Sequence, residues 1–482
     1  FLEKAKNSDE PILSYAVDIQ NHGPYFYDKY GENLPYSCDV NLTEEAANNF
    51  GSYFLGVKDM DIMIGEVYDM MMNFDEPTIM VFYGDHLPGL GNEPSAFDEI
   101  GINLSHDDLA KEIEFYSTPY VVVANERGRE FLNRENVEKY FLYLEREIKL
   151  YENFLKNKII DTIFIGGGTP TSVDTKFIVR ILKILKNFEF AENIEITIES
   201  NPNSLTSEKT KIYFESGINR ISIGAQSFND KILKEIGRIH KSSDIYNAVE
   251  NAKSAGFKNI NLDLMLALPH QKFSDIEKSI NCIEELKIPH TSYYSLILEE
   301  DTQLYEMHKK SPLSFPTEDE DRKMYHYMTY SLSKLEINQY EISNFSKNGY
   351  ECRHNLNYWK LKDYISFGLS SSSSVGNLRY TNTFHFKNYF DSIDKNEKPI
   401  DFFENLSKKD RMNEFIMMGL RLNCGISLDE FDLRFEENFI RFYKNEIEKN
   451  IELGLIELKE NRIYLTKKGR DLSNQVELNF FR

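Results

Sequence analysis

The chain has 482 residues, which is enough for two to four domains and a large buried core. It carries 78 acidic and 56 basic residues, and its formal net charge of −22 argues against general binding to nucleic acid or to anionic membranes. Small molecules or proteins are therefore the expected partners. No apolar run approaches the roughly 18 to 20 residues that a membrane span needs. The cysteines stand far apart, so neither a disulfide framework nor a zinc site is indicated: Cys38, Cys282, Cys352 and Cys424.

The first block, residues 1–125, contains two predicted strands that end in polar residues. Residues 14–19 alternate like a strand and lead into QNHGPY, and residues 78–83 form an apolar strand that ends in Gly84-Asp85-His86. Asp85 and His86 can both reach one divalent metal, with His22 arriving from the other strand end. A lone Asp–His pair is more often structural.

The phrases QNHGPY and FYGDHLPGLG resemble the catalytic domain of the lipoteichoic acid synthase and phosphoglycerol transferase family, a sulfatase-like domain. The resemblance implies that Asp85 and His86 ligate Mn or Mg and that His22 lies near the substrate. It covers only the C-terminal part of that domain, so the threonine nucleophile, an earlier acidic ligand and the membrane helices of the family would lie upstream of Phe1. We therefore expect a fragment at the N-terminus.

After a charged link at residues 126–130, the pattern changes to alternating helices and strands. Apolar residues recur every three or four positions from Val137 to Leu155, which predicts one amphipathic helix of more than four turns. Amphipathic helices then alternate with predicted strands at 159–165, 194–199, 219–225, 259–266 and 291–298. This alternation predicts an α/β fold with a parallel sheet, open or closed, whose functional residues lie at the C-terminal strand ends.

The first of these strands runs into a glycine turn, Gly166-Gly167-Gly168-Thr169. Glycines let a ligand approach the backbone, and Thr171 with Asp174 resembles a capped helix start, where free amides favour anionic groups. The turn fits neither a Walker loop nor a dinucleotide fingerprint. The alternative is a turn that merely lets a helix pack close to its strand.

Polar residues lie on the later strands. Glu199 and Gln226 follow two apolar strands, and Asp263 lies inside the next one. Single carboxylates at strand ends are often helix caps, but carboxylates on successive parallel strands lie close together at the C-terminal end of the sheet. Arg238 can pair with a ligand carboxylate through its two-pronged guanidinium, the alternative being a surface salt bridge.

Eight ordered motifs resemble the oxygen-independent coproporphyrinogen III oxidase family of radical S-adenosylmethionine (SAM) proteins over residues 130–482: IFIGGGTPT, IESNPNSL, NRISIGAQSFND, IGRIH, NINLDLMLALP, SYYSLILEEDT, YEISNF and ECRHNLNYW. The last two point to its haem-chaperone branch, HemW. The resemblance implies a partial (β/α)6 barrel in which SAM is contacted by Gly167, Gly168, Thr169, Glu199, Gln226, Arg238 and Asp263. It also implies that His354 binds haem, and the neighbouring sole tryptophan would form an aromatic wall. The alternative for His354 is a histidine hydrogen-bonded in a polar loop.

The chain departs from this family at its cofactor loop. The family's first strand ends in a CxxxCxxC motif that holds a [4Fe-4S] cluster, and here that strand and loop are absent. None of the four cysteines can replace the motif, so radical generation is not expected. The strand before the glycine turn is expected to have an unpaired edge. Ala267 and His270 stand where glycines are expected, and a serine run at 370–374 replaces a small residue followed by histidine.

Residues 299–405 are expected to form a helix and loop extension that carries the HNxxYW motif, and residues 406–482 a winged-helix-like docking domain. The expected domains are thus 1–125, 126–298, 299–405 and 406–482. The function expected is that of a cytoplasmic, haem- and SAM-binding protein of porphyrin and haem metabolism, with haem-recipient proteins as further partners. Whether it is an enzyme stays open. The alternative is a remnant phosphoglycerol transferase, joined near residues 125–135 by a chimeric reading frame.

Overall fold

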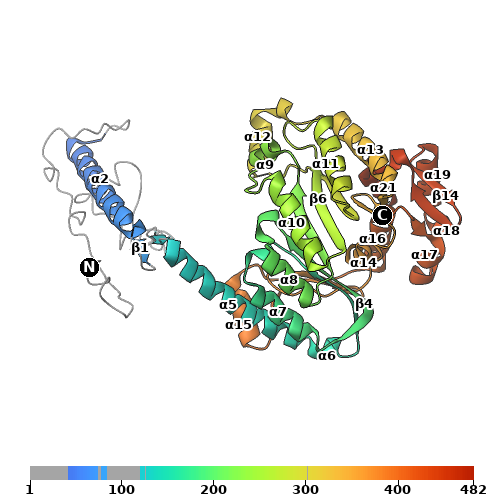
Figure 1. Ribbon diagram of the computed structural model, residues 1–482, viewed down its shortest axis with the longest axis horizontal. Helices are drawn as coiled ribbons and strands as arrows, with labels where there is room; N and C mark the ends of the chain where they lie inside the picture. The colour runs from blue at the N-terminus through green and yellow to red at the C-terminus, as the bar shows by residue number, and fades with distance from the viewer. Residues whose placement is uncertain (1–41, 74–77, 84–119, 125, 301, 482) are drawn as a thin grey trace. The chain divides into compact units, whose positions relative to one another are not determined.

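A computed structural model describes residues 42–73, 78–83, 120–124, 126–300 and 302–481 (Figure 1). The chain divides into two compact units, Phe1–Lys139 and Tyr140–Arg482. Within the described ranges, no helix combines the length and the apolar character that crossing a membrane requires.

The described part of the first unit contains a long helix, a strand pair and the beginning of helix α5, Glu126–Leu150. Helix α2, Glu44–Met72, begins at the N-cap Thr43, whose side chain accepts a hydrogen bond from the amide of Ala46. Strands β1, Ile79–Tyr83, and β2, Tyr120–Ala124, pair in antiparallel register. Strand β1 confirms the predicted strand at 78–83. The predicted strand at 14–19 and the metal-binding candidates His22, Asp85 and His86 lie outside the described residues.

The second unit is built on a seven-stranded sheet of order β3-β4-β5-β6-β7-β9-β8. Its first five strands are parallel: β3 Ile159–Ile165, β4 Glu189–Ser200, β5 Arg220–Gln226, β6 Asn259–Leu266 and β7 His290–Ser295. Strands β9, Asn344–Ser346, and β8, Asn338–Glu341, extend the sheet in antiparallel orientation. All five predicted strands are confirmed, and β3 lies at the edge, as expected from the missing first strand.

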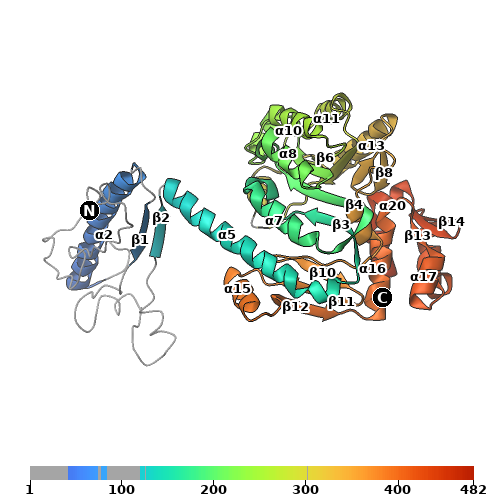
Figure 2. The ribbon, with the colours of Figure 1, turned by 60° about the horizontal axis from the view of Figure 1, so that its bottom comes forward.

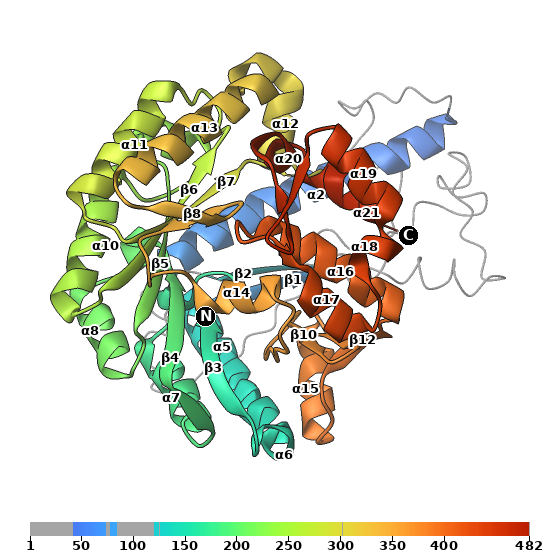
Figure 3. The same ribbon diagram turned by 90° about the vertical axis from the view of Figure 1, so that its right-hand side faces the viewer.

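Helices follow the outer face of this curved sheet (Figure 3). They are α7 Thr175–Leu185, α8 Ser207–Glu215, α9 Asp230–Glu235, α10 Ser242–Ala255 and α11 Phe273–Glu285. Strand residues alternate accordingly. Apolar side chains such as Ile198, Ile223 and Leu262 are buried, while the alternate positions are polar, as at Thr197 and Asn261. The inner face of the sheet is therefore a polar surface.

Two predicted helix boundaries are wrong. The single helix expected over 137–155 is split into α5, Glu126–Leu150, and α6, Glu152–Leu155. Thr171 does not cap a helix, because the turn Pro170–Ser172 is a 3-10 helix and the N-cap of α7 is Asp174. The hydroxyl of Thr171 is instead buried against Ser204, with 2.6 Å between the two oxygens.

The extension adds helices and a small antiparallel sheet. Its helices are α12 Gln303–Lys310, α13 Glu318–Lys334, α14 Arg353–Trp359 and α15 Phe386–Asp394. The sheet has the order β10-β11-β12, with β10 Ser372–Val375, β11 Leu378–Asn382 and β12 Ile400–Asn405. Glu147 of α5 accepts hydrogen bonds from the Gly368 amide (2.8 Å), Asn382 (2.6 Å) and the Tyr389 hydroxyl (2.6 Å), so one buried carboxylate ties α5 to this extension.

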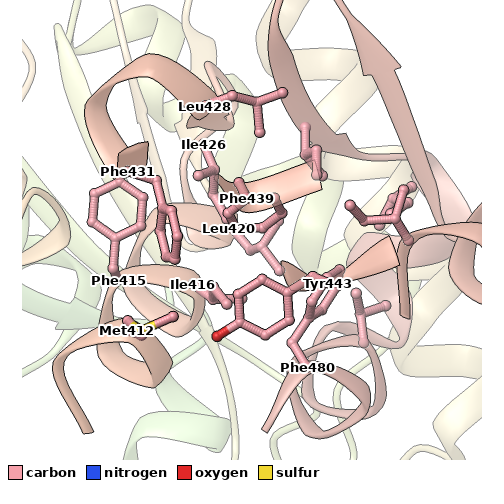
Figure 4. Close-up of a cluster of buried hydrophobic side chains, with 14 of the residues drawn as sticks. Met412, Phe415, Ile416, Leu420, Ile426, Leu428, Phe431, Phe439, Tyr443 and Phe480 are labelled. Carbon is pink, nitrogen blue, oxygen red and sulfur yellow. The ribbon is translucent and has the colours of Figure 1, made fainter. Parts of the chain in front are cut away.

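The C-terminal part has its own apolar core (Figure 4), in which Phe415, Phe431, Phe439 and Tyr443 pack ring against ring. Its elements are α16 Lys408–Arg421, β13 Ile426–Ser427, α17 Leu428–Phe435, α18 Phe439–Phe442, α19 Lys444–Glu452, β14 Ile456–Lys459, β15 Arg462–Leu465, α20 Lys467–Asp471 and α21 Ser473–Phe480. Helix, hairpin and helix follow one another here, as predicted.

Candidate functional site at the strand ends

The glycine turn is shaped by its contact with Glu199. A Cβ atom on Gly166 would lie 2.7 Å from Oε2 of Glu199, and the amide of Gly167 donates a hydrogen bond to the same oxygen (3.2 Å). Gly167 and Gly168 adopt φ values of 84° and 69°, which only glycine adopts without strain. The glycines therefore allow the carboxylate of Glu199, from the next strand, to contact the backbone of the turn. The alternative, that they serve only to let a helix pack close to its strand, does not account for this contact.

Thr169 is held at the same edge of the sheet. Asn201, just past the end of β4, donates a hydrogen bond from its side-chain nitrogen to the hydroxyl of Thr169 (2.9 Å). Two hydrogen bonds, one to Glu199 and one from Asn201, thus connect the turn after β3 to the end of β4.

Glu199 and Asp263 place two carboxylates on the inner face. Burial raises the pKa of Glu199, and the negative charge of Asp263 raises it further, while the Gly167 amide lowers it. Asp263 accepts hydrogen bonds from Ser222 and from Asn261, both at 2.8 Å. Two carboxylates close enough to influence each other favour a cationic ligand.

Gln226 and Arg238 come from the end of β5 and the loop beyond it. Gln226 has a φ of 61°, an uncommon conformation for a residue with a side chain, and its position coincides with an irregular register between β5 and β6. Arg238 is half-buried, and burial lowers its pKa. Among the described residues no carboxylate forms an ion pair with Arg238, so its guanidinium can bind an anionic group of a ligand.

A chain of hydrogen bonds continues across the inner face. Asn261 accepts at 2.6 Å from Nδ1 of His290, whose Nε2 lies 2.8 Å from the hydroxyl of Tyr340. That hydroxyl accepts from the amide of Cys352 (3.1 Å) at the start of α14. This network was not predicted from the sequence. The sequence feature that could have predicted it is the alternation of polar residues at every second position in NINLD and HTSYYS, which places them on one face of the sheet.

His354 lies in α14, two residues after Cys352 at the end of this network. Its Nδ1 is 2.7 Å from the hydroxyl of Thr162, and its Nε2 is 2.8 Å from the hydroxyl of Tyr358. Burial and the charge of Arg220 lower its pKa to about 4, so the imidazole is neutral at pH 7. Thr162 precedes Gly166 by four strand residues, which is about 13 Å. The ring of Phe164 lies between the two: it stacks on His354, and its Cε1 atom would lie 3.0 Å from a Cβ on Gly166, so His354 is one aromatic ring away from the glycine turn.

The rest of the HNLNYW motif faces the C-terminal helices. The guanidinium carbon of Arg421, in α16, lies 4.4 Å from the ring centre of Trp359, and Arg421 also pairs with the fully buried Glu341 (3.1 Å). The ring of Phe164 stacks on His354 at 5.0 Å. In this structure the motif joins the edge strand β3 to α16.

The described cysteines do not fit an iron–sulfur cluster. Cys282 is buried in α11, Cys352 is buried beside Glu195, and Cys424 is exposed in the turn before β13. Burial raises the pKa of the Cys352 thiol to about 11, which keeps it protonated. Across the part of the chain that the structure describes, no group of three or more metal-ligating side chains comes together. Cys38 lies outside it.

Three family models match parts of the chain. Residues 115–283 match the Radical SAM superfamily, residues 406–472 match the HemN C-terminal domain, and residues 1–141 match the Sulfatase family. The first and third matches overlap at residues 115–141, which includes the junction predicted near 125–135. The predicted domain boundaries themselves stay a prediction.

The relatives of the second unit are haem chaperones. HemW of Bacillus subtilis is 34% identical over 348 residues, which cover 72% of this chain and 92% of that protein. HemW of Lactococcus lactis is 36% identical over 335 residues, 69% of this chain and 88% of that protein. HemW of Escherichia coli is 33% identical over 266 residues, 52% of this chain and 69% of that protein.

Among solved structures, the coproporphyrinogen III oxidase HemN from Escherichia coli, described as a radical SAM enzyme, superposes with a TM-score of 0.64 at 21% identity. The match covers 72% of this chain and 83% of that chain, and it shows a common fold. The predicted fold class is confirmed as an α/β protein with a curled radical SAM sheet, and the Sulfatase match lies on its N-terminal side.

Proposed function

Because the chain belongs to the HemW family of radical SAM proteins, we propose that its second unit binds SAM at the strand ends and binds haem, as a haem carrier of the cytoplasm. The proposed SAM site is supported by one observation: the Gly167 amide and the carboxylates of Glu199 and Asp263 lie close together at the strand ends. The haem part rests on the relatives, which are named haem chaperones.

The polar groups at the strand ends match the charges of SAM, which has a sulfonium, an ammonium and a carboxylate. We assign the cationic groups to Glu199 and Asp263 and the carboxylate to Arg238, whose guanidinium is free among the described residues. Gly167, Gly168 and Thr169 would supply backbone contacts, and Gln226 would close the end of β5. SAM bound here would be a ligand held by charge and hydrogen bonds.

Radical chemistry is not part of this proposal. An iron–sulfur cluster supplies the electron that cleaves SAM in the superfamily, and the cysteines of this chain do not fit such a cluster. We therefore propose a binding protein rather than an oxidoreductase. For the first unit, Mn or Mg at Asp85 and His86 stays a proposal that rests on the sulfatase-like sequence alone.

Titration calorimetry of the full chain with SAM tests the strand-end site. We expect saturable binding that weakens at least tenfold in Asp263→Asn and in Arg238→Gln. Glu208→Gln, on the surface of α8, is the matched control and should bind as the wild type does. Equal affinity in all four proteins would contradict the assignment.

Titration of the full chain with hemin tests the haem part. We expect a Soret band that shifts and saturates at one equivalent. After anaerobic treatment with iron and sulfide, protein-bound sulfide should stay at background. Stoichiometric iron and sulfide would instead require cluster ligands that we have not found.

A further inference from the structure

A polar cavity of about 420 Å³ lies between the extension and the C-terminal part. One side is formed by the turn between β10 and β11, at Gly376 and Asn377, and the other by Lys408 and Arg411 of α16 with Arg434 near the end of α17. Figure 2 shows α16 lying between the small sheet and α17. The volume is in the range of cavities that hold small molecules, and none of the strand-end residues lines it.

Arg411 is the most deeply buried cation of this cavity. The residue is 7% exposed, and one terminal nitrogen of its guanidinium donates to Glu414 (2.8 Å). Among the described residues its guanidinium makes no other hydrogen bond. Glu414 also pairs with Arg379, so one carboxylate serves two arginines and the three side chains together carry one net positive charge. A buried guanidinium with unused N–H donors favours an anionic ligand.

Arg434 adds a second cation without an ion pair in the described part of the chain. Its guanidinium donates to the carbonyl of Leu361 (2.9 Å). Burial lowers its pKa and the charge of Arg411 lowers it further, which means that the two guanidinium groups lie close enough to repel each other. Lys408, the first residue of α16, is instead paired with Glu437 (3.1 Å). An anion between the two arginines would offset their repulsion.

Two carboxylates also line the cavity. Asp363 accepts a hydrogen bond from the amide of Gly376 (2.8 Å), which fixes the turn between β10 and β11, and its charge raises the pKa of Arg434. Glu436 is exposed. Neither carboxylate forms an ion pair with a cation among the described residues. They limit the positive charge of the cavity without occupying the donors of the arginines.

We propose that this cavity binds a small molecule through a carboxylate or phosphate group whose oxygens accept hydrogen bonds from Arg411 and Arg434. The planar guanidinium presents paired donors that match both groups. The site does not depend on the proposed binding of SAM or haem.

Two sources can supply such a group, a free small molecule or the propionates of haem. The second source is included because the cavity is connected to the HNLNYW motif. Tyr364, which follows Asp363, packs edge-on against Tyr358 with 4.6 Å between the ring centres, and the hydroxyl of Tyr358 is 2.8 Å from Nε2 of His354. Two aromatic rings thus separate the cavity wall from His354.

The test is titration calorimetry of the full chain with inorganic phosphate and with succinate, at constant ionic strength. We expect Arg434→Gln, and Asn377→Asp, which adds a negative charge with little change in shape, each to weaken binding about fivefold or more. Glu436→Gln removes a negative charge from the lining and should tighten binding about twofold. Arg441→Gln and Asn396→Asp are the matched controls, because they make the same charge changes at exposed positions outside the cavity and should bind as the wild type does.

The absence of saturable binding of either probe, or equal affinity in all six proteins, overturns the inference. Circular dichroism checks that the weakened variants are folded, and misfolding cannot produce the gain expected for Glu436→Gln. Competition then identifies the source of the group. Displacement of the probe by hemin but not by hemin dimethyl ester assigns the site to the propionates, and retention of the probe in both cases assigns it to a free small molecule.

Discussion

The hydroxyl of Thr162 lies 2.7 Å from Nδ1 of His354, and this contact joins the inner face of the edge strand β3 to helix α14. Among the strands that the structure describes, β3 has a neighbour, β4, on one side only. Glu195 of the neighbouring β4 accepts from the amides of Arg353 and His354, both at 3.1 Å, and so caps α14. Helix α14, which carries the HNLNYW motif, is therefore hydrogen-bonded to both β3 and β4 at the edge of the sheet.

Thr162→Val should destabilise the second unit by about 1 to 2 kcal/mol, because it leaves a buried imidazole nitrogen without its partner. Urea unfolding followed by the fluorescence of Trp359 measures the change. Thr381→Val is the control, since its hydroxyl meets Ser372 (3.0 Å) at an exposed position and its loss should cost less than about 0.5 kcal/mol. Similar losses in the two variants would argue that the Thr162–His354 contact contributes nothing.

Glu147 should make stability depend on pH. Burial raises its pKa from 4.5 to about 7, so the folded state binds a proton that the unfolded state has released. The sign follows from this difference: the stabilising effect of the protonated form is lost as pH rises from about 4.5 to about 7. Between pH 5 and pH 8 the wild type should lose about 2 to 3 kcal/mol relative to Glu147→Gln, which cannot ionise.

Urea unfolding of both proteins at several pH values measures this difference. Tyr389→Phe removes one of the donors to the carboxylate, so it should move the pH midpoint upward. A constant difference between wild type and Glu147→Gln from pH 5 to pH 8 would refute the assignment.

Arg421→Met should destabilise the protein by about 3 to 5 kcal/mol. The substitution removes the ion-pair partner of Glu341, which has no exposed surface and otherwise accepts from Ser343 and Asn344. Adding Glu341→Gln to the variant should recover part of the loss, because a neutral amide is easier to bury. Thermal unfolding measures both variants, and a double variant that is no more stable than Arg421→Met would count against a charge effect.

Ala267→Gly should stabilise the second unit by about 0.5 to 1 kcal/mol. Ala267 has a φ of 58°, a conformation in which a Cβ atom is strained, and glycine relieves that strain. Ala255→Gly, at the last residue of α10, is the opposite control and should destabilise by a similar amount. Calorimetric melting checks the signs, and the same sign for both substitutions would contradict the argument.

Gly166→Ala should weaken SAM binding about tenfold, because its new Cβ atom would displace the carboxylate of Glu199 from the turn. Gly349→Ala, in the loop after β9, is a control for backbone strain without a steric clash: its φ of 84° is left-handed, unlike that of Gly166, and no atom lies within 4 Å of the added Cβ. It should lower stability and leave SAM affinity unchanged. Calorimetric affinities of the two variants separate these effects.

The sequence determined the order of strands and helices in the second unit and the family to which it belongs. The five parallel strands follow from apolar runs between amphipathic helices. The glycine turn is visible because Gly166 leaves no room for a Cβ beside Glu199, and Gly167 and Gly168 have positive φ values. The positions that resemble family glycines, Ala267 and His270, indeed have positive φ values of 58° and 57°. A positive φ is a property of one residue and favours glycine there, so a sequence pattern can reveal it.

Only the tertiary structure decided what the histidines can do. His354 was predicted as a haem ligand from its motif, and this role stays a prediction. The structure adds that its ring nitrogens contact Thr162, 192 residues away in the chain, and Tyr358. Whether a histidine can ligate a metal depends on the hydrogen bonds that its ring nitrogens make, and these depend on residues that can be far apart in the sequence.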